Sequence, residues 1–138
     1  MDISEKIFDQ TGKIMSTSIK SVHPLEGVKM ELSFSSEIKG SGKFPNGRNL
    51  GGGMMTQYPH GIVDASYQGV FSTEGGEQYF WWAHEKSKLV EGKAKGLVTV
   101  TGFTNARQLS WLNDLIIVID SEADLASQEF KGIAYQWK

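Results

Sequence analysis

The clearest hydrophobic pattern in the chain is the strict alternation of residues 28–40, VKMELSFSSEIKG. The apolar side chains share one parity: Val28, Met30, Leu32, Phe34 and Ile38. Hydroxyl and charged side chains occupy the other parity. Because neighbouring side chains of a β-strand point to opposite faces, the segment predicts a strand with one buried and one solvated face.

Shorter alternating or β-branched runs continue this pattern along the rest of the chain. They cover residues 12–22, 54–58, 62–73, 77–86, 93–104, 114–120 and 129–138. In the first of them Ile14 and Ile19 fall on opposite parities, which predicts a bulge or a loop between them. The glycine-rich residues 40–53 predict an irregular connection, and residues 105–114 predict one short helix with Asn105 as its cap.

Short turns such as Pro59-His60-Gly61 and Glu74-Gly75-Gly76 join the predicted strands. About seven to nine strands follow one another, and no helix is long enough for a parallel crossover. We therefore expect an all-β fold, a lipocalin-like antiparallel meander barrel of about eight strands with one short helix or loop. Closure of the sheet also removes its exposed edges. The length of 138 residues fits a single domain, residues 1–138.

The strand at 77–86, EQYFWWAHEK, carries large aromatic side chains on both parities. One parity combines aromatic rings with hydrogen-bonding groups: Gln78, Phe80, Trp82, His84 and Lys86. Such a mixture is typical of a ligand pocket, so we assign this parity to the barrel lumen. The other parity, with Tyr79, Trp81 and Ala83, is expected to pack outward under a loop, a helix or a second subunit.

Composition excludes several classes of function. The chain has no cysteine, which excludes disulfides, thiolate catalysis and cysteine-based metal sites. Its 14 basic and 16 acidic residues give a net charge of -2 without a block of like charge, so we expect no nucleic acid and no membrane partner. No apolar run approaches the roughly 20 residues that span a bilayer. The N-terminus lacks the layout of a signal peptide, which predicts a cytoplasmic protein.

Three segments together resemble a known protein family. They are PHGIVDASYQGVFSTEGGEQYFWW at 59–82, NLGGG at 49–53 and SWLNDLIIV at 110–118. Their order and spacing are similar to those of the proteins grouped as domain of unknown function 3237, from about residue 38 to the C-terminus. The resemblance implies a single-domain antiparallel β-barrel of the lipocalin-like or allene-oxide-cyclase-like kind, without an established activity.

The chain departs from this family pattern at two places. Met54 and Met55 follow Gly53, where the family typically continues through an acidic residue and a tryptophan. Trp82 and His84 stand where the family often carries arginines. A pocket suited to an anionic ligand in the family would therefore be suited here to an apolar or aromatic ligand.

His84 is the strongest candidate for catalysis, with Tyr67 as the second. A histidine beside two tryptophans can titrate near neutral pH and act as a general acid or base. The alternative is a histidine at the strand end that bonds Glu85 or water. Trp111, Leu112 and Asn113 of the family-like motif have a structural alternative of their own, in which Trp111 closes one barrel end and Asn113 holds the turn.

Aromatic and methionine side chains on the predicted inner face and at the barrel mouth are the candidate ligand contacts. They are Tyr58, His60, Tyr67, Phe80, Trp82, His84 and Met54. Aromatic residues at alternating positions can equally form an ordinary core, because a barrel of about eight strands is either filled by side chains or holds one small ligand. The histidines are not spaced as metal ligands and the glycine-rich loops do not precede a helix, so we expect no metal and no cofactor.

Three hypotheses for function remain open. The first is binding of a small apolar or aromatic molecule in the barrel lumen. The second is a cyclase or isomerase that folds a bound substrate in the same cavity, with His84 or Tyr67 moving a proton. The third is a homo-oligomeric interaction protein without a ligand, in which the outward Tyr79 and Trp81 form the subunit interface.

Overall fold

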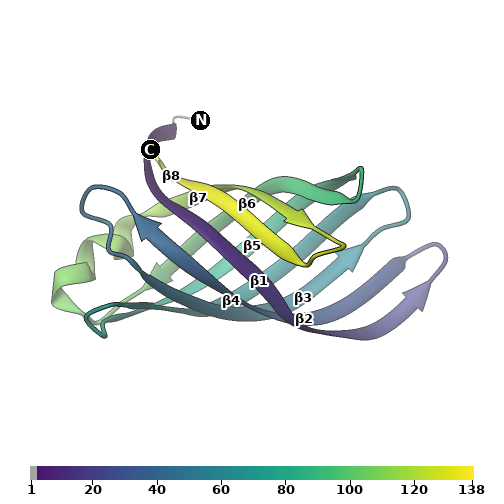
Figure 1. Ribbon diagram of the computed structural model, residues 1–138, viewed down its shortest axis with the longest axis horizontal. Helices are drawn as coiled ribbons and strands as arrows, with labels where there is room; N and C mark the ends of the chain where they lie inside the picture. The colour runs from purple at the N-terminus through teal and green to yellow at the C-terminus, as the bar shows by residue number, and fades with distance from the viewer. Residues whose placement is uncertain (1–2) are drawn as a thin grey trace.

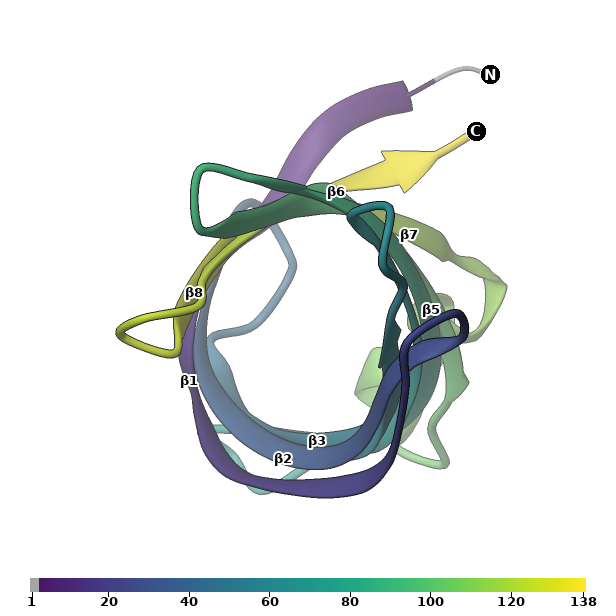
Figure 2. The same ribbon diagram turned by 90° about the vertical axis from the view of Figure 1, so that its right-hand side faces the viewer.

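The computed structural model describes residues 3–138 and shows a closed barrel of eight antiparallel strands (Figure 1). The elements are β1 (Ile3–His23), β2 (Gly27–Gly40), β3 (Gly47–Gln57), β4 (Ile62–Thr73), β5 (Gln78–Val90), β6 (Lys93–Phe103), the 3₁₀ helix η1 (Arg107–Asp114), β7 (Ile116–Asp124) and β8 (Glu129–Trp137). Each strand pairs with the next, and β1 pairs with β8 to close the ring seen end-on in Figure 2. The predicted all-β meander barrel of about eight strands is confirmed.

The predicted irregularity in the first strand is a pair of β-bulges. The pairing of β1 with β2 shifts between Ile14 and Ser16 and again between Ile19 and Ser21. The first shift inserts one extra residue, so Ile14 and Ile19 lie opposite Phe34 and Met30 and share one face in spite of their opposite parity.

The prediction of an irregular connection over 40–53 is wrong for its second half, because β3 begins at Gly47. The glycines of β3 lie where neighbouring groups leave no room for a side chain. A Cβ atom at Gly51 would come within 2.7 Å of the Trp81 ring and 2.9 Å of the Phe34 ring. These glycines therefore belong to a regular strand that passes beneath large aromatic side chains.

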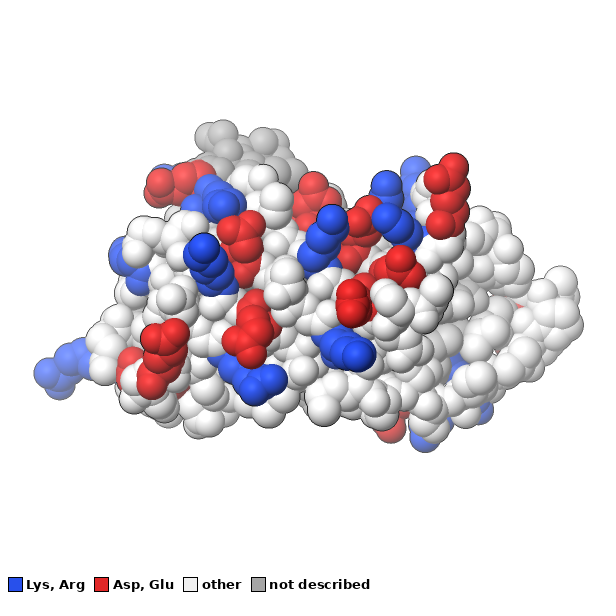
Figure 3. Space-filling model, in the orientation of Figure 1, with Lys and Arg blue, Asp and Glu red and all other residues white. Residues whose placement is uncertain are grey.

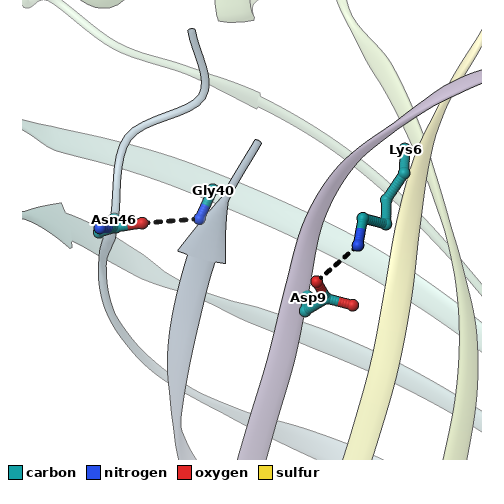
Figure 4. A network of polar contacts seen from close by, with 4 residues as sticks. All are labelled: Lys6, Asp9, Gly40 and Asn46. Carbon is teal, nitrogen blue, oxygen red and sulfur yellow. Dashed lines mark hydrogen bonds and ion pairs between the residues drawn. The ribbon is translucent and has the colours of Figure 1, made fainter. Parts of the chain in front are cut away.

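One end of the barrel is closed by η1 and by the loop that joins β2 to β3 (left side of Figure 1). Leu109 and Leu112 of η1 are buried in the core together with Phe44 of the loop. Asn46 Oδ1 accepts a 2.8 Å hydrogen bond from the Gly40 amide and fixes this loop to the end of β2 (Figure 4). The close-up also shows the exposed pair of Lys6 and Asp9 on β1.

Asn113 connects η1 to the end of β6. Its side chain accepts a 2.7 Å bond from the Thr104 amide and donates a 3.1 Å bond to the Thr104 carbonyl. The predicted structural role of Asn113 is thus observed. The prediction that Asn105 caps the helix is wrong, because Ala106 occupies the N-cap position and makes no side-chain cap bond. The Thr104 hydroxyl accepts from the Ala106 amide instead.

The opposite end of the barrel carries the extended hairpin of β1 and β2, which projects at the right of Figure 1. Ile19 and Val22 near its tip are 63% and 69% exposed although they pair with Met30 and Val28, which lie on the inward parity of β2. They lie beyond the ring of strands, where no opposite wall covers them.

The predicted inner face of 78–86 is wrong. Tyr79 and Trp81 are buried, at 3% and 6% exposure, whereas Phe80 and Trp82 are 42% and 55% exposed. The inward parity of β5 therefore carries Tyr79, Trp81, Ala83, Glu85 and Ser87. Gln78, His84 and Lys86 are solvated on the outer face, and Glu85 and Ser87 bond each other on the inner face.

Candidate functional site

The barrel contains a cavity of about 390 Å³ to which every strand contributes side chains. This volume lies in the range of about 300–1,000 Å³ that is usual for small-molecule sites. The wall is mainly apolar, with valine, isoleucine and alanine from β5, β6 and β7 and aromatic rings from β2, β4, β5 and β8.

Phe34 of β2 is the centre of an aromatic cluster in the wall. Its ring meets those of Tyr67 and Phe130 edge to face, with centroids 5.3 and 5.6 Å away. It stacks with Trp81 at 6.1 Å. These are favourable aromatic geometries, and they hold the four rings in fixed positions around the cavity.

The position of the Trp81 ring is fixed by a hydrogen bond and by a neighbouring glycine that leaves room for the ring. Its indole Nε1 donates a 2.7 Å bond to Asn49 Oδ1. A Cβ atom at Gly69 would lie 2.4 Å from the indole, so only glycine leaves room for the ring on β4. The buried amide and indole satisfy each other, which keeps the rest of the indole available as an apolar wall.

Glu85 is the polar centre of the lumen, and its side chain is buried. The Tyr67 hydroxyl donates a 2.8 Å hydrogen bond to Glu85 Oε1, and the Ser87 hydroxyl donates a 2.5 Å bond to Oε2. Burial raises the pKa of Tyr67 well above its ordinary value, and the charge and hydrogen bond of Glu85 raise it further. Tyr67 therefore keeps its proton and remains a donor to Glu85.

Tyr79 carries a second buried hydroxyl, close to Gly102 of β6. Among the described residues it is the one buried side-chain polar atom without a hydrogen-bond partner. Burial raises the pKa of Tyr79 to about 12. The hydroxyl therefore stays neutral at ordinary pH.

Among the side chains of residues 5–138 that line the cavity, Glu85 is the one charged group. The ion pairs of the described residues join side chains that are each at least 25% exposed, and Glu85 belongs to none of them. Figure 3 shows basic and acidic side chains interspersed on one outer face of the barrel. The lumen is thus weakly polar with a single acidic position.

Of the predicted ligand contacts, Tyr67 lies in the cavity wall and the others do not. Phe80, Trp82 and Met54 are exposed on the outer face of the barrel. Their assignment to the lumen depended on the wrong parity of 78–86 and, for Met54, on a strand whose Met55 points inward instead.

His84 also lies outside, where its Nε2 is 2.9 Å from Asp64 Oδ1. It therefore does not share a space with Tyr67, and the predicted catalytic pair is not brought together. Tyr58 and His60 stack loosely in the turn between β3 and β4, with ring centroids 5.6 Å apart, and both are exposed.

The predicted subunit interface through Tyr79 and Trp81 is wrong, because both rings point into the barrel. Glu85 and Asn49, in contrast, are central residues that the sequence reasoning missed. Glu85 shares the parity of Tyr79, Trp81 and Ala83, which the sequence pattern had assigned to the outer face. Asn49 falls in the stretch that was predicted to be irregular.

The described residues contain no group of three or more histidine, cysteine, aspartate and glutamate side chains that could hold a metal ion. None of the helices in the described part of the chain has the length and apolar character needed to cross a membrane.

Solved structures of low sequence identity have the same fold. A protein of unknown function from Clostridium acetobutylicum ATCC 824 matches with a TM-score of 0.82 at 15% identity, over 99% of this chain and 100% of that one. A β-barrel like protein from Acinetobacter baumannii AYE matches with a TM-score of 0.82 at 16% identity, over 100% of this chain and 98% of that one.

An enzyme from Penicillium herquei matches with a TM-score of 0.75 at 16% identity, over 99% of this chain and 96% of that one. At these identities the likeness concerns the barrel fold alone. No family model and no curated protein matches the chain, so the resemblance to domain of unknown function 3237 stays a prediction.

Proposed function

We propose that this barrel binds a small, largely apolar or aromatic molecule in its lumen. The observation that carries the proposal is the cavity of about 390 Å³, walled by apolar and aromatic side chains around one buried carboxyl group. An ordinary core is packed almost as densely as an organic crystal and contains few voids larger than a water molecule. A barrel of this strand number is either filled by side chains or leaves room for one small ligand, and here room is left.

The polar groups of the wall support the same proposal. Among the described lining residues Glu85 is the one charged side chain, and neutral polar side chains such as Asn49, Gln10 and Ser121 are outnumbered by apolar ones. Ligand sites commonly combine a large apolar wall with a small number of polar groups that fix the orientation of the ligand. Membership in domain of unknown function 3237 is likewise a proposal, which rests on the Trp111-Leu112-Asn113 motif and its place after the 59–82 hairpin.

The test is a thermal-shift screen against a metabolite collection, followed by titration of each hit against two variants. Ala83→Trp places an indole in the cavity wall, whereas Ser66→Trp places the same side chain on the exposed outer face of the neighbouring strand. Hits that bind the lumen should lose affinity at least tenfold in Ala83→Trp and keep it in Ser66→Trp. Equal affinity for both variants contradicts the proposal.

A cyclase or isomerase acting in the same cavity is the second candidate. The hydrogen bond between Tyr67 and Glu85 favours it, because the carboxylate can accept a proton from a bound substrate, and protonation of Glu85 would free the Tyr67 hydroxyl to donate to the charge left on that substrate. Chromatography of each neutral hit after incubation tests this candidate. An enzyme should convert the hit, and Glu85→Gln should still bind it without conversion; a hit that is recovered unchanged from the wild-type protein speaks against catalysis on that compound.

A further inference from the structure

We propose that the lumen selects ligands that carry a positive charge on nitrogen, such as a protonated amine on an apolar or aromatic body, with Glu85 as the counter-ion. This inference rests on the proposed function, namely that the lumen is a binding site, and it adds the chemical class of the ligand.

The first argument is the electrostatic isolation of Glu85. Its side chain is buried at 8% exposure, and both of its carboxyl oxygens accept hydrogen bonds, from the Tyr67 and Ser87 hydroxyls. The carboxylate form of Glu85 can accept both of these bonds at the same time. Buried charges in proteins are normally paired, yet no basic side chain of residues 5–138 lines the cavity. The missing positive charge is a group that a ligand can supply.

The second argument is that Glu85 has hydrogen-bond acceptor sites that Tyr67 and Ser87 do not use. An ionised carboxylate offers about four lone-pair sites. Tyr67 occupies one site on Oε1 and Ser87 occupies one on Oε2. The two hydroxyls hold the carboxylate in place and leave a further site on each oxygen for the N–H groups of an ammonium or amidinium ion.

The third argument is the aromatic surface beside the carboxylate. Tyr67 both donates to Glu85 and packs edge to face against Phe34, which in turn contacts Trp81 and Phe130. Aromatic faces attract cations that lie within about 6 Å of the ring centre, and more strongly where water is excluded. The same rings suit the apolar body of such a ligand.

The charge pattern also sets a selectivity. An anionic ligand would bring a second negative charge into a cavity whose one charged wall residue is Glu85. A neutral alcohol or phenol can donate a hydrogen bond to Glu85 but leaves its charge uncompensated. The expected order of affinity is therefore amine, then alcohol, then carboxylate.

Three probes with the same apolar body test this order: naphthylethylamine, naphthylethanol and naphthylacetate. Each is titrated by calorimetry at neutral pH into the wild-type protein, Glu85→Gln and Ala83→Trp. We expect the wild-type protein to bind the amine roughly tenfold or more tightly than the alcohol and to bind naphthylacetate most weakly, since hydrogen bonds to charged groups are stronger than neutral ones. Glu85→Gln keeps the shape of the side chain and should abolish this preference, because it weakens binding of the amine much more than binding of the alcohol.

Ala83→Trp shows where the amine binds. Loss of amine binding in this variant places the probe in the lumen, and retained binding places it outside the lumen and overturns the inference. If Glu85→Gln does not fold, as judged by circular dichroism, the order of the three probes in the wild-type protein decides alone.

The inference and the proposed function fail in different ways. Equal affinities for the three probes, or tightest binding of naphthylacetate, overturn the cation preference, whereas loss of that binding in Ala83→Trp still supports a binding lumen. An unchanged preference for the amine in folded Glu85→Gln also overturns the role of Glu85. Failure of all three probes to bind overturns the inference, and the metabolite screen then decides on the proposed function independently.

Discussion

The Tyr67 hydroxyl and the Glu85 carboxylate meet inside the barrel wall, where the phenol donates a 2.8 Å hydrogen bond to Oε1. The two residues lie on adjacent strands, because Ala65 of β4 pairs with Glu85 of β5 and Tyr67 follows two positions later on the same face. The phenol therefore reaches diagonally across the β4–β5 ladder to the carboxylate.

Removal of this donor should weaken the fold measurably. Tyr67→Phe leaves one oxygen of a buried carboxylate with one fewer donor, which should lower the free energy of unfolding by about 1–3 kcal/mol. Tyr79→Phe is the matched control, because the Tyr79 hydroxyl has no hydrogen-bond partner and its loss should change stability little or raise it. Urea denaturation of both variants tests the difference, and equal destabilisation by the two substitutions would argue against it.

Stability should fall at alkaline pH because of the same two tyrosines. Burial raises the pKa of both, in the case of Tyr79 to about 12. The folded protein therefore keeps protons that the unfolded chain releases above its ordinary tyrosine pKa of about 10. Their contribution to stability is fully present below about pH 10 and declines as the pH rises from there through the folded values.

Urea denaturation at several pH values between about 9 and about 12 checks the alkaline prediction. Tyr79→Phe should flatten the decline because one titrating group is removed. A pH profile that is flat for the wild-type protein, or equally steep for Tyr79→Phe, would contradict the assignment.

The adjacent tryptophans of β5 should respond differently to a ligand. Trp81 lines the cavity and is buried, whereas Trp82 is exposed on the outer face. Acrylamide should quench the Trp82 emission strongly and leave Trp81 largely protected. A lumen ligand should alter the fluorescence of Trp82→Phe and have little effect on Trp81→Phe. The reverse pattern would indicate that the ligand binds the outer face of β5, at Trp82.

The stability of the closed end of the barrel should depend on the Asn113 side chain. Asn113→Ala removes both of its hydrogen bonds to the Thr104 backbone and should cost about 1–3 kcal/mol of stability. Asn105→Ala is a suitable control, because Asn105 is exposed and does not cap η1. Thermal denaturation distinguishes the two substitutions, and an Asn113→Ala variant as stable as the wild-type protein would remove the proposed role of this side chain.

The strands with one solvated face could be predicted from the sequence. The alternation of 28–40 became β2, Gly27–Gly40, and the predicted helix at 105–114 became η1. The glycine-rich β3 was only partly predictable, because its glycines are determined by Trp81 and Phe34, which lie far away in the sequence. The early part of β1 was missed because residues 3–11 show no clear alternation.

The inner face of β5 was not predictable from local pattern, and this accounts for most of the missed site. Tyr79 and Trp81 are as apolar as Phe80 and Trp82, so hydrophobicity alone gives no preference. The choice is made by contacts between strands: Gly51 and Gly69 leave room for Trp81, and Asn49 and Tyr67 provide partners for the inner polar groups. Tyr67 was found because β4 has one clearly apolar parity.

The central claim is that the cavity of the barrel is the place where a small molecule binds. Methyl-labelled NMR during a titration with naphthylethanol tests it most directly. We predict shift changes and probe contacts at lumen methyl groups such as those of Ala83, Val98 and Val100, with the exposed methyl groups of Leu50 and Leu97 unaffected. Perturbations confined to Leu50, Leu97 and other outer positions would contradict the account.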